Sequence, residues 1–134
     1  MNELLFCFVI LVVLISGCNN ETYEDKYLTL SEITNHLEES GFDLEKRDLI
    51  IKSEVASEQV TFNIAPNHIF SIYVFNEEAS KEQSEGELHN KYNTMNFGNS
   101  LIVASIKNAQ IYLIKGDERD FEIENNVFKG LGDL

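Results

Sequence analysis

The most constraining segment of this sequence is a short run with apolar side chains on both of its faces. Residues 69–75 read IFSIYVF, with apolar residues in both alternating registers. Because successive side chains of a strand point to opposite faces of a sheet, such a run is typical of a central strand covered on two sides. The sequence therefore predicts a sheet with packing layers on both faces.

Four further segments carry strand patterns. Residues 48–55 and 59–65 each alternate between apolar and polar side chains, which predicts two half-buried strands. Residues 101–106 and 110–114 flank the sequence Lys107-Asn108-Ala109, which predicts an antiparallel hairpin. The residues that we expect in the core of these strands and of the central one include Phe62 and Ile72.

The first predicted helix covers residues 29–41. Thr29 and Glu32 have the spacing of a capping box, and apolar residues recur at i, i+3 and i+7 from Leu30. Gly41 stands where a chain that leaves a helix often needs a positive φ angle.

Two more helices are predicted after the central strand. Asn76 can cap a helix through residues 77–91, whose apolar stripe of Ala79, Leu88 and Tyr92 is thin. This segment holds five acids and two lysines, so we expect a mostly solvated helix that lies shallowly on the sheet. Residues 118–131 carry apolar side chains at i, i+4 and i+8 and predict a final helix.

The resulting order, α-β-β-β-α-β-β-α, predicts the α+β class, with helices packed on an antiparallel or mixed sheet. A chain of 134 residues is the size of one domain. Residues 19–27 are polar and acidic and carry no apolar periodicity. We therefore expect a single domain over residues 28–134, preceded by a short tether over residues 18–27.

The N-terminus carries an unbroken apolar run over residues 4–15, followed by Ser16, Gly17 and Cys18. As a helix this run would reach about 18 Å, which is short of the roughly 30 Å of a bilayer core. An apolar run of that length that ends in small residues is typical of a secretory signal peptide. The alternative is a hydrophobic N-terminus that is not cleaved.

The junction LISGC at residues 14–18 resembles the lipobox of bacterial lipoproteins. In that family a peptidase cuts before the cysteine, whose sulfur carries a diacylglycerol. The resemblance implies a signal peptide over residues 1–17 and lipid attachment at Cys18. Residues 1–3 carry no Lys or Arg, unlike the family's usual pattern, so a positive charge there would come from the α-amino group or from residues upstream of Met1.

The body of the chain is also similar to small lipoproteins of Bacillus-type bacteria. The similarity lies in the strand that runs into an acidic helix at residues 72–79 and in the sequence NSLIVA at residues 99–104. It implies a location on the outer side of the cell membrane and no particular activity.

The charge of the chain excludes several classes of partner. The formal net charge is −13, and removal of residues 1–17 would leave −12 because Glu3 is lost. Nucleic-acid affinity depends on basic residues, as does docking on anionic lipid. Since Cys7 would be removed and Cys18 acylated, the mature protein would have no free thiol or disulfide, which suits an oxidising exterior.

Residues with catalytic or metal-binding chemistry form no recognisable motif. His36, His68 and His89 lack the spacing of a metal-binding helix, and we expect each at the surface. The acids of residues 117–124 lack the fixed offsets of a calcium loop and are more typical of a helix N-terminus. No nucleophile elbow or phosphate loop is present. We therefore predict no catalytic residue, no metal site and no cofactor.

These observations favour a membrane-anchored, non-catalytic binding module in the cell envelope with a protein partner. The alternatives are a receptor for a small ligand or cation that uses the acidic patches and, third, a small envelope hydrolase.

Overall fold

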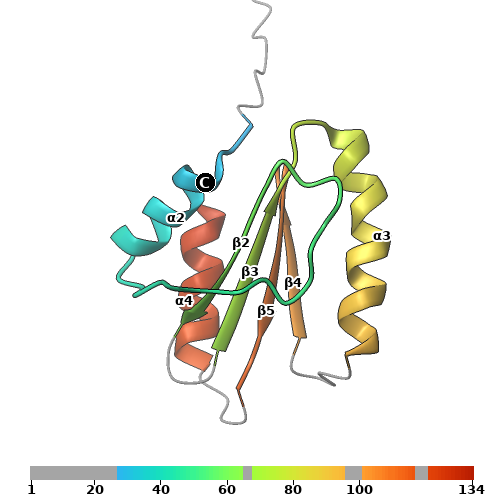
Figure 1. Cartoon of the computed structure of the whole chain (residues 1–134). Helices are drawn as coiled ribbons and strands as arrows, with labels where there is room; N and C mark the ends of the chain where they lie inside the picture. The colour runs from blue at the N-terminus through green and yellow to red at the C-terminus, as the bar shows by residue number, and fades with distance from the viewer. Residues whose placement is uncertain (1–26, 65–67, 96–100, 117–120) are drawn as a thin grey trace, which may run out of the picture.

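A computed structural model describes residues 27–64, 68–95, 101–116 and 121–134 (Figure 1). In chain order, the elements are α2 (Leu30–Glu39), β1 (Glu45–Arg47), β2 (Glu58–Ile64), β3 (His68–Val74), α3 (Glu78–Thr94), β4 (Leu101–Ile106), β5 (Ala109–Ile114) and α4 (Phe121–Gly132). The predicted α+β class and element order are confirmed. Among the described residues, no helix is long and apolar enough to cross a membrane.

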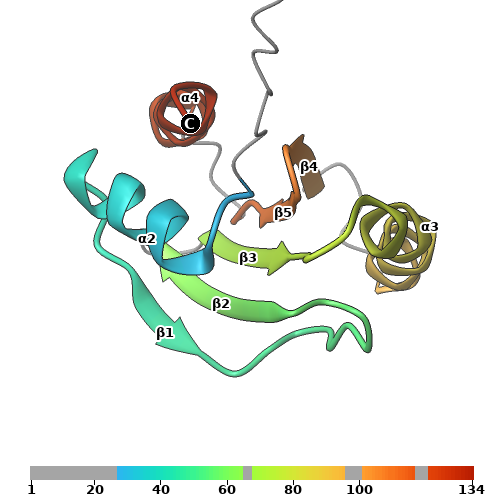
Figure 2. The same ribbon diagram turned by 90° about the horizontal axis from the view of Figure 1, so that it is seen from above.

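The strands form one antiparallel sheet in the order β1-β2-β3-β5-β4. Figure 2 shows α2 and α4 on one face of this sheet and α3 on the other. The central strand β3 is covered on both sides, as its sequence predicts, and Ile72 and Tyr73 on its opposite faces are both fully buried. The expected core residue Phe62 is also buried.

Two apolar cores result. The larger one lies under α2 and α4 and includes Ile33, Leu37, Phe70, Ile72, Leu113, Val127 and Leu131. The smaller one lies under α3 and includes Ile51, Tyr73, Phe75, Leu88, Tyr92, Tyr112 and Ile114.

Helix α2 begins with the predicted capping box. The Thr29 side chain accepts from the backbone N–H of Glu32, and the Glu32 carboxylate accepts from the backbone N–H of Thr29 at 2.9 Å. Gly41 has φ +94°, so the predicted positive angle after the helix is also confirmed.

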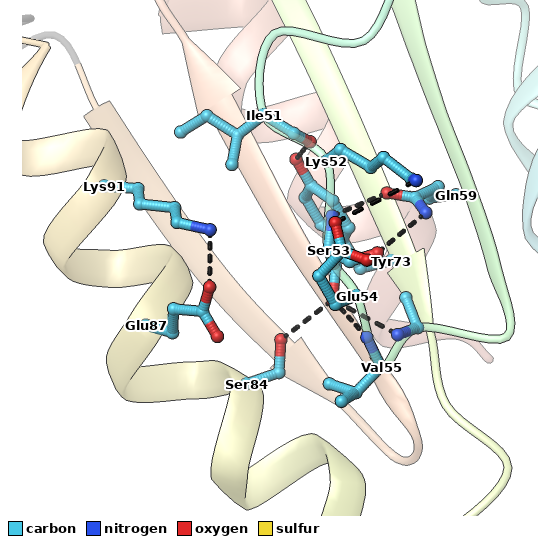
Figure 3. Close-up of polar contacts among 11 residues, drawn as sticks. Ile51, Lys52, Ser53, Glu54, Val55, Gln59, Tyr73, Ser84, Glu87 and Lys91 are labelled. Carbon is cyan, nitrogen blue, oxygen red and sulfur yellow. Dashed lines mark hydrogen bonds and ion pairs between the residues drawn. The ribbon is translucent and has the colours of Figure 1, made fainter.

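The prediction of a strand over residues 48–55 is wrong. The strand that pairs with the outer edge of β2 is β1, which has three residues, and the segment 51–56 is not paired with any described strand. Its side chains nevertheless alternate between buried and exposed, because a side chain of β2 bonds to its backbone where a neighbouring strand would do so. Ser53 N–H donates to Gln59 Oε1 at 2.8 Å, and Gln59 Nε2 donates to Ser53 O at 3.1 Å (Figure 3). This segment crosses the α3 face of the sheet as a strap, a name that we keep for residues 51–56.

The predicted apolar stripe of helix α3 is confirmed at Leu88 and Tyr92 and is wrong at Ala79. Ala79 is exposed, and the buried residues are Lys81, Ser84, Leu88 and Tyr92. The N-cap is Glu77 rather than Asn76, with no side-chain cap hydrogen bond. Helix α4 ends near the predicted position, and Val127 and Leu131 are buried as expected. The signal peptide and residues 18–26 of the tether lie outside the described residues.

Candidate functional site

The exposed surface of α3 is strongly acidic. The helix attaches to the sheet through Lys81, Ser84, Leu88 and Tyr92, at the 3- and 4-residue spacing of one helical face. The acids of this segment are all exposed: Glu77, Glu78, Glu82, Glu85 and Glu87. Burial of this particular stripe therefore leaves every carboxylate in solvent, as the sequence predicts.

The carboxylates of α3 occupy two sides of the helix. Glu87 forms an ion pair with Lys91 on the side that faces the strap, as Figure 3 shows. Glu78, Glu82 and Glu85 follow one another at i, i+4 and i+7, so they share another side of the helix. We call these three residues the acidic row. Within the described part of the chain, Glu78 is the member of the row with an ion pair, to Lys81 at 3.7 Å.

A cluster of three buried tyrosines holds the sheet, the strap and α3 together. Tyr73 Oη donates to Ile51 O at 2.6 Å and lies 2.8 Å from Tyr92 Oη. The rings of Tyr92 and Tyr112 are stacked with centroids 4.3 Å apart. Burial raises the pKa of all three phenols above the ordinary value of 10. These hydroxyl groups stay protonated near neutral pH and serve as structural hydrogen-bond groups.

A pocket of about 530 Å³ lies between Tyr27, the N-terminal turn of α3 and the β4–β5 turn. Its lining residues are Tyr27, Glu78, Lys81, Lys107 and Asn108. The Lys81 ammonium donates to Lys107 O, and the Lys107 ammonium donates to Leu134 O at 2.7 Å. The two lysines in the lining disfavour binding of a cation in this pocket.

Asn108 is the residue in this region that the sequence analysis missed. It is 2% exposed, and its side-chain amide donates to Leu28 O at 2.9 Å and to Phe75 O at 2.8 Å. Its Oδ1 accepts from Leu28 N at 2.7 Å. An asparagine in a hairpin turn is so ordinary that the sequence carries no signal for this role.

The three histidines do not converge. His89 is exposed, as expected, and His36 is partly buried and donates through Nε2 to Gly130 O. The surface position expected for His68 is wrong, because this residue is 3% exposed and neither ring nitrogen has a partner in the described part of the chain. It begins β3 on the α2–α4 face, where the alternation of the strand places it with Phe70.

The acids of the last helix are also only partly as expected. Glu124 is buried and pairs with Lys115 at 3.4 Å, while residues 117–120 lie outside the described part. The described residues contain no group of three or more His, Cys, Asp or Glu side chains that could hold a metal ion.

Comparison with protein-family models, with curated proteins and with solved structures finds no match to this chain.

Proposed function

We propose that this protein is a lipid-anchored binding module on the outer side of the cytoplasmic membrane. In this proposal residues 1–17 are a signal peptide, Cys18 carries the lipid, and the folded domain binds a basic protein partner through the acidic surface of α3. The observation that carries the proposal is the LISGC junction, followed after a short polar stretch by the folded domain.

The short stretch before the domain supports a location close to the membrane. Nine residues separate Cys18 from Leu28, so Leu28 at the start of the domain would stay within about 33–36 Å of the acylated cysteine. Leu28 is buried and bonded on both backbone groups to Asn108, which supports a domain that begins at this residue. A lipid anchor would raise the effective concentration of the domain toward membrane-bound partners.

The charge of the domain supports a basic protein partner. Residues 28–134 hold 19 acidic and 9 basic residues, and their net charge of −10 repels anionic headgroups and accelerates encounters with basic surfaces. The exposed acids of α3 concentrate negative charge on one helix. The lysines of this helix, Lys81 and Lys91, form ion pairs with Glu78 and Glu87 and neutralise part of that charge.

Lipid attachment is tested by the Cys18→Ala variant. We expect the intact mass of the wild-type membrane fraction to show loss of residues 1–17 and added lipid, and the variant to accumulate as unprocessed precursor. Cleavage and lipid-free secretion of the variant would contradict lipid attachment.

Partner binding is tested by charge reversal. We expect Glu77→Lys, Glu78→Lys and Glu82→Lys together to weaken co-purification of membrane proteins at low salt. The matched control reverses three exposed acids elsewhere, Glu38→Lys, Glu39→Lys and Glu54→Lys, with the same change in net charge. Equal recovery of partners by both variants, retained at high salt, would show that the acids of α3 only keep the domain soluble.

A further inference from the structure

The two edges of the sheet are protected very differently. Edge strand β1 has three residues, Glu45, Lys46 and Arg47, and all three are charged and exposed. Short length and charge are the usual means by which proteins prevent unwanted pairing at a sheet edge. The other edge strand, β4, has twice the length and the sequence LIVASI, without a charged residue or a proline. Among the described strands β4 pairs with β5 alone.

The hydrogen-bond register determines which groups of β4 are free. Phe75 N–H donates to Asn108 O at 2.9 Å, so this pair is hydrogen-bonded, and the alternation of an antiparallel ladder directs Gln110, Tyr112 and Ile114 toward β3. The intervening residues of β5 therefore bond to β4, where their partners are Ile102, Ala104 and Ile106. It follows that Val103 and Ser105 turn their backbone N–H and C=O groups away from the sheet.

The side chains of these same residues point to the face that carries α3. Val103 lies opposite Tyr112, a member of the core under α3, and is 39% exposed. Helix α3 therefore leaves this part of β4 uncovered. The outward backbone groups and an exposed apolar side chain occur together at Val103.

The acidic row lies near this open edge. Gln110, which lies opposite Ser105, donates through Nε2 to Lys81 O at 3.3 Å, and Tyr112, which lies opposite Val103, stacks on Tyr92 farther along α3. The N-terminal turn of α3 is joined to the β4–β5 turn because the Lys81 ammonium donates to Lys107 O. The row therefore follows β4 from its last residues toward Val103.

We propose that β4 is a docking edge for an extended basic segment of a partner protein. The segment adds a sixth, antiparallel strand through the backbone groups of Val103 and Ser105. The residues of the segment that lie directly opposite Val103 and Ser105 point to the α3 face. Lys or Arg side chains at these positions lie next to the acidic row. Alternate residues of a strand are about 6.8 Å apart and the row spans about 10 Å of helix, so two or three basic side chains can reach it.

Charge excludes the other simple occupant, a second copy of this chain. Two antiparallel β4 strands paired about a two-fold axis perpendicular to the sheet would form one continuous sheet, with both α3 helices on the same face. The two acidic rows would then approach each other across the junction, and like charges in close juxtaposition are unfavourable. A basic segment reverses the sign of this interaction. Strand addition to an exposed edge is an established mode of peptide recognition.

The test uses the full chain, purified from membranes in a non-ionic detergent, and a seven-residue peptide that alternates lysine and valine between terminal threonines. We expect this peptide to bind at least ten-fold more tightly than its glutamate counterpart, and more weakly in 0.5 M salt. Methylation of the lysine backbone nitrogens should weaken binding ten-fold or more, because these N–H groups face β4. Methylation of the valine backbone nitrogens should not.

Variants of the protein test the same geometry from the other side. Val103→Pro removes an outward N–H without removing a bond to β5, so binding should fall ten-fold while the circular dichroism spectrum is retained. Glu82→Lys with Glu85→Lys should also weaken binding. The matched control, Glu54→Lys with Glu87→Lys, changes the net charge equally on the strap side and should bind normally.

The proposal rests on the proposed function, and the two can fail separately. If reversal of the acidic row weakens binding but methylated lysines and Val103→Pro do not, the acidic partner surface stands and strand addition is refuted. If the lysine and glutamate peptides bind alike, both are refuted. A β4-dependent dimer in sedimentation experiments, abolished by Val103→Pro, would identify a second copy as the occupant. The methylated peptides decide the question even if Val103→Pro does not fold.

Discussion

Asn108 and Leu28 are 80 residues apart in the sequence and are joined by two hydrogen bonds, one in each direction. The asparagine side chain thus pairs with the backbone of Leu28 as a neighbouring strand would. Its second amide proton bonds to Phe75 O, so the start of the domain, the end of β3 and the β4–β5 turn share one residue. The start of the folded domain therefore depends on a turn near its C-terminal end.

Replacement of Asn108 should destabilise the domain strongly. Asn108→Ala leaves the N–H and C=O of Leu28 and the C=O of Phe75 without this partner, and each buried polar group left unsatisfied costs about 1–3 kcal/mol. We expect a loss of about 2–4 kcal/mol in the free energy of unfolding, measured by urea denaturation. Asn90→Ala, at an exposed position of α3, is the control. Equal stability of the two variants would contradict this role.

Gln59 should determine the position of the strap. Gln59→Leu removes both hydrogen bonds to Ser53, and we expect faster hydrogen exchange at Ser53, Val55 and Ala56. The unfolding free energy should fall by about 1–3 kcal/mol. Gln83→Leu on the exposed side of α3 should change neither measurement. Unchanged exchange in the Gln59 variant would mean that the strap is held by Tyr73 and Ser84 alone.

His68 should be dispensable for stability. Its ring is buried with no hydrogen-bond partner in the described part of the chain, and an unsatisfied buried polar group is unfavourable. We expect His68→Phe to raise the unfolding free energy by about 1 kcal/mol, because an apolar ring of similar shape carries no such penalty. His89→Phe, an exposed change on α3, serves as the control. A lower unfolding free energy in the His68 variant would show that the imidazole of His68 does make a stabilising hydrogen bond.

The tyrosine cluster should make the domain sensitive to alkali. Burial raises the folded-state pKa of Tyr73, Tyr92 and Tyr112 above 10, so in the unfolded chain these groups lose protons first. Their contribution is complete below pH 10 and is lost as the pH rises from 10 toward the folded-state values. With three such groups the unfolding free energy should fall by up to about 4 kcal/mol per pH unit.

The measurement is urea denaturation between pH 9 and 11.5, with tyrosinate absorbance followed at the same time. Tyr92→Phe is the informative variant, because it removes one titrating group and should flatten the slope by about 1.4 kcal/mol per pH unit. Tyrosinate absorbance from these buried groups should appear together with unfolding. Identical slopes in the variant and the wild type would show that Tyr92 does not contribute.

The sequence by itself determined those features that depend on local chemistry. Thr29 and Glu32 specify a helix start because both partners of the capping box lie within one turn, and Gly41 follows because only a residue without Cβ adopts its φ angle easily. The two-faced run of β3 likewise required cover on both sides of the sheet. The apolar run of residues 4–15 and the LISGC junction at residues 14–18 are equally local, and the proposed lipid attachment depends on them.

Tertiary structure decided what depends on distant partners. Residues 48–55 have the period of a strand, but the partner of Ser53 is the side chain of Gln59 and not another backbone, so a real alternation predicts the wrong element. His68 became buried because β3 continues under the core. Helix α3 buries Lys81 and Ser84 rather than Ala79 because Lys107 O and the Ser53 hydroxyl bond to them. The edge position of β4 among the described strands is decided in the same way, since its place beside β5, and not its apolar sequence, leaves Val103 exposed. Local sequence patterns indicate which backbone and side-chain groups need a hydrogen-bond partner or burial, whereas the packed fold determines which distant residues provide it.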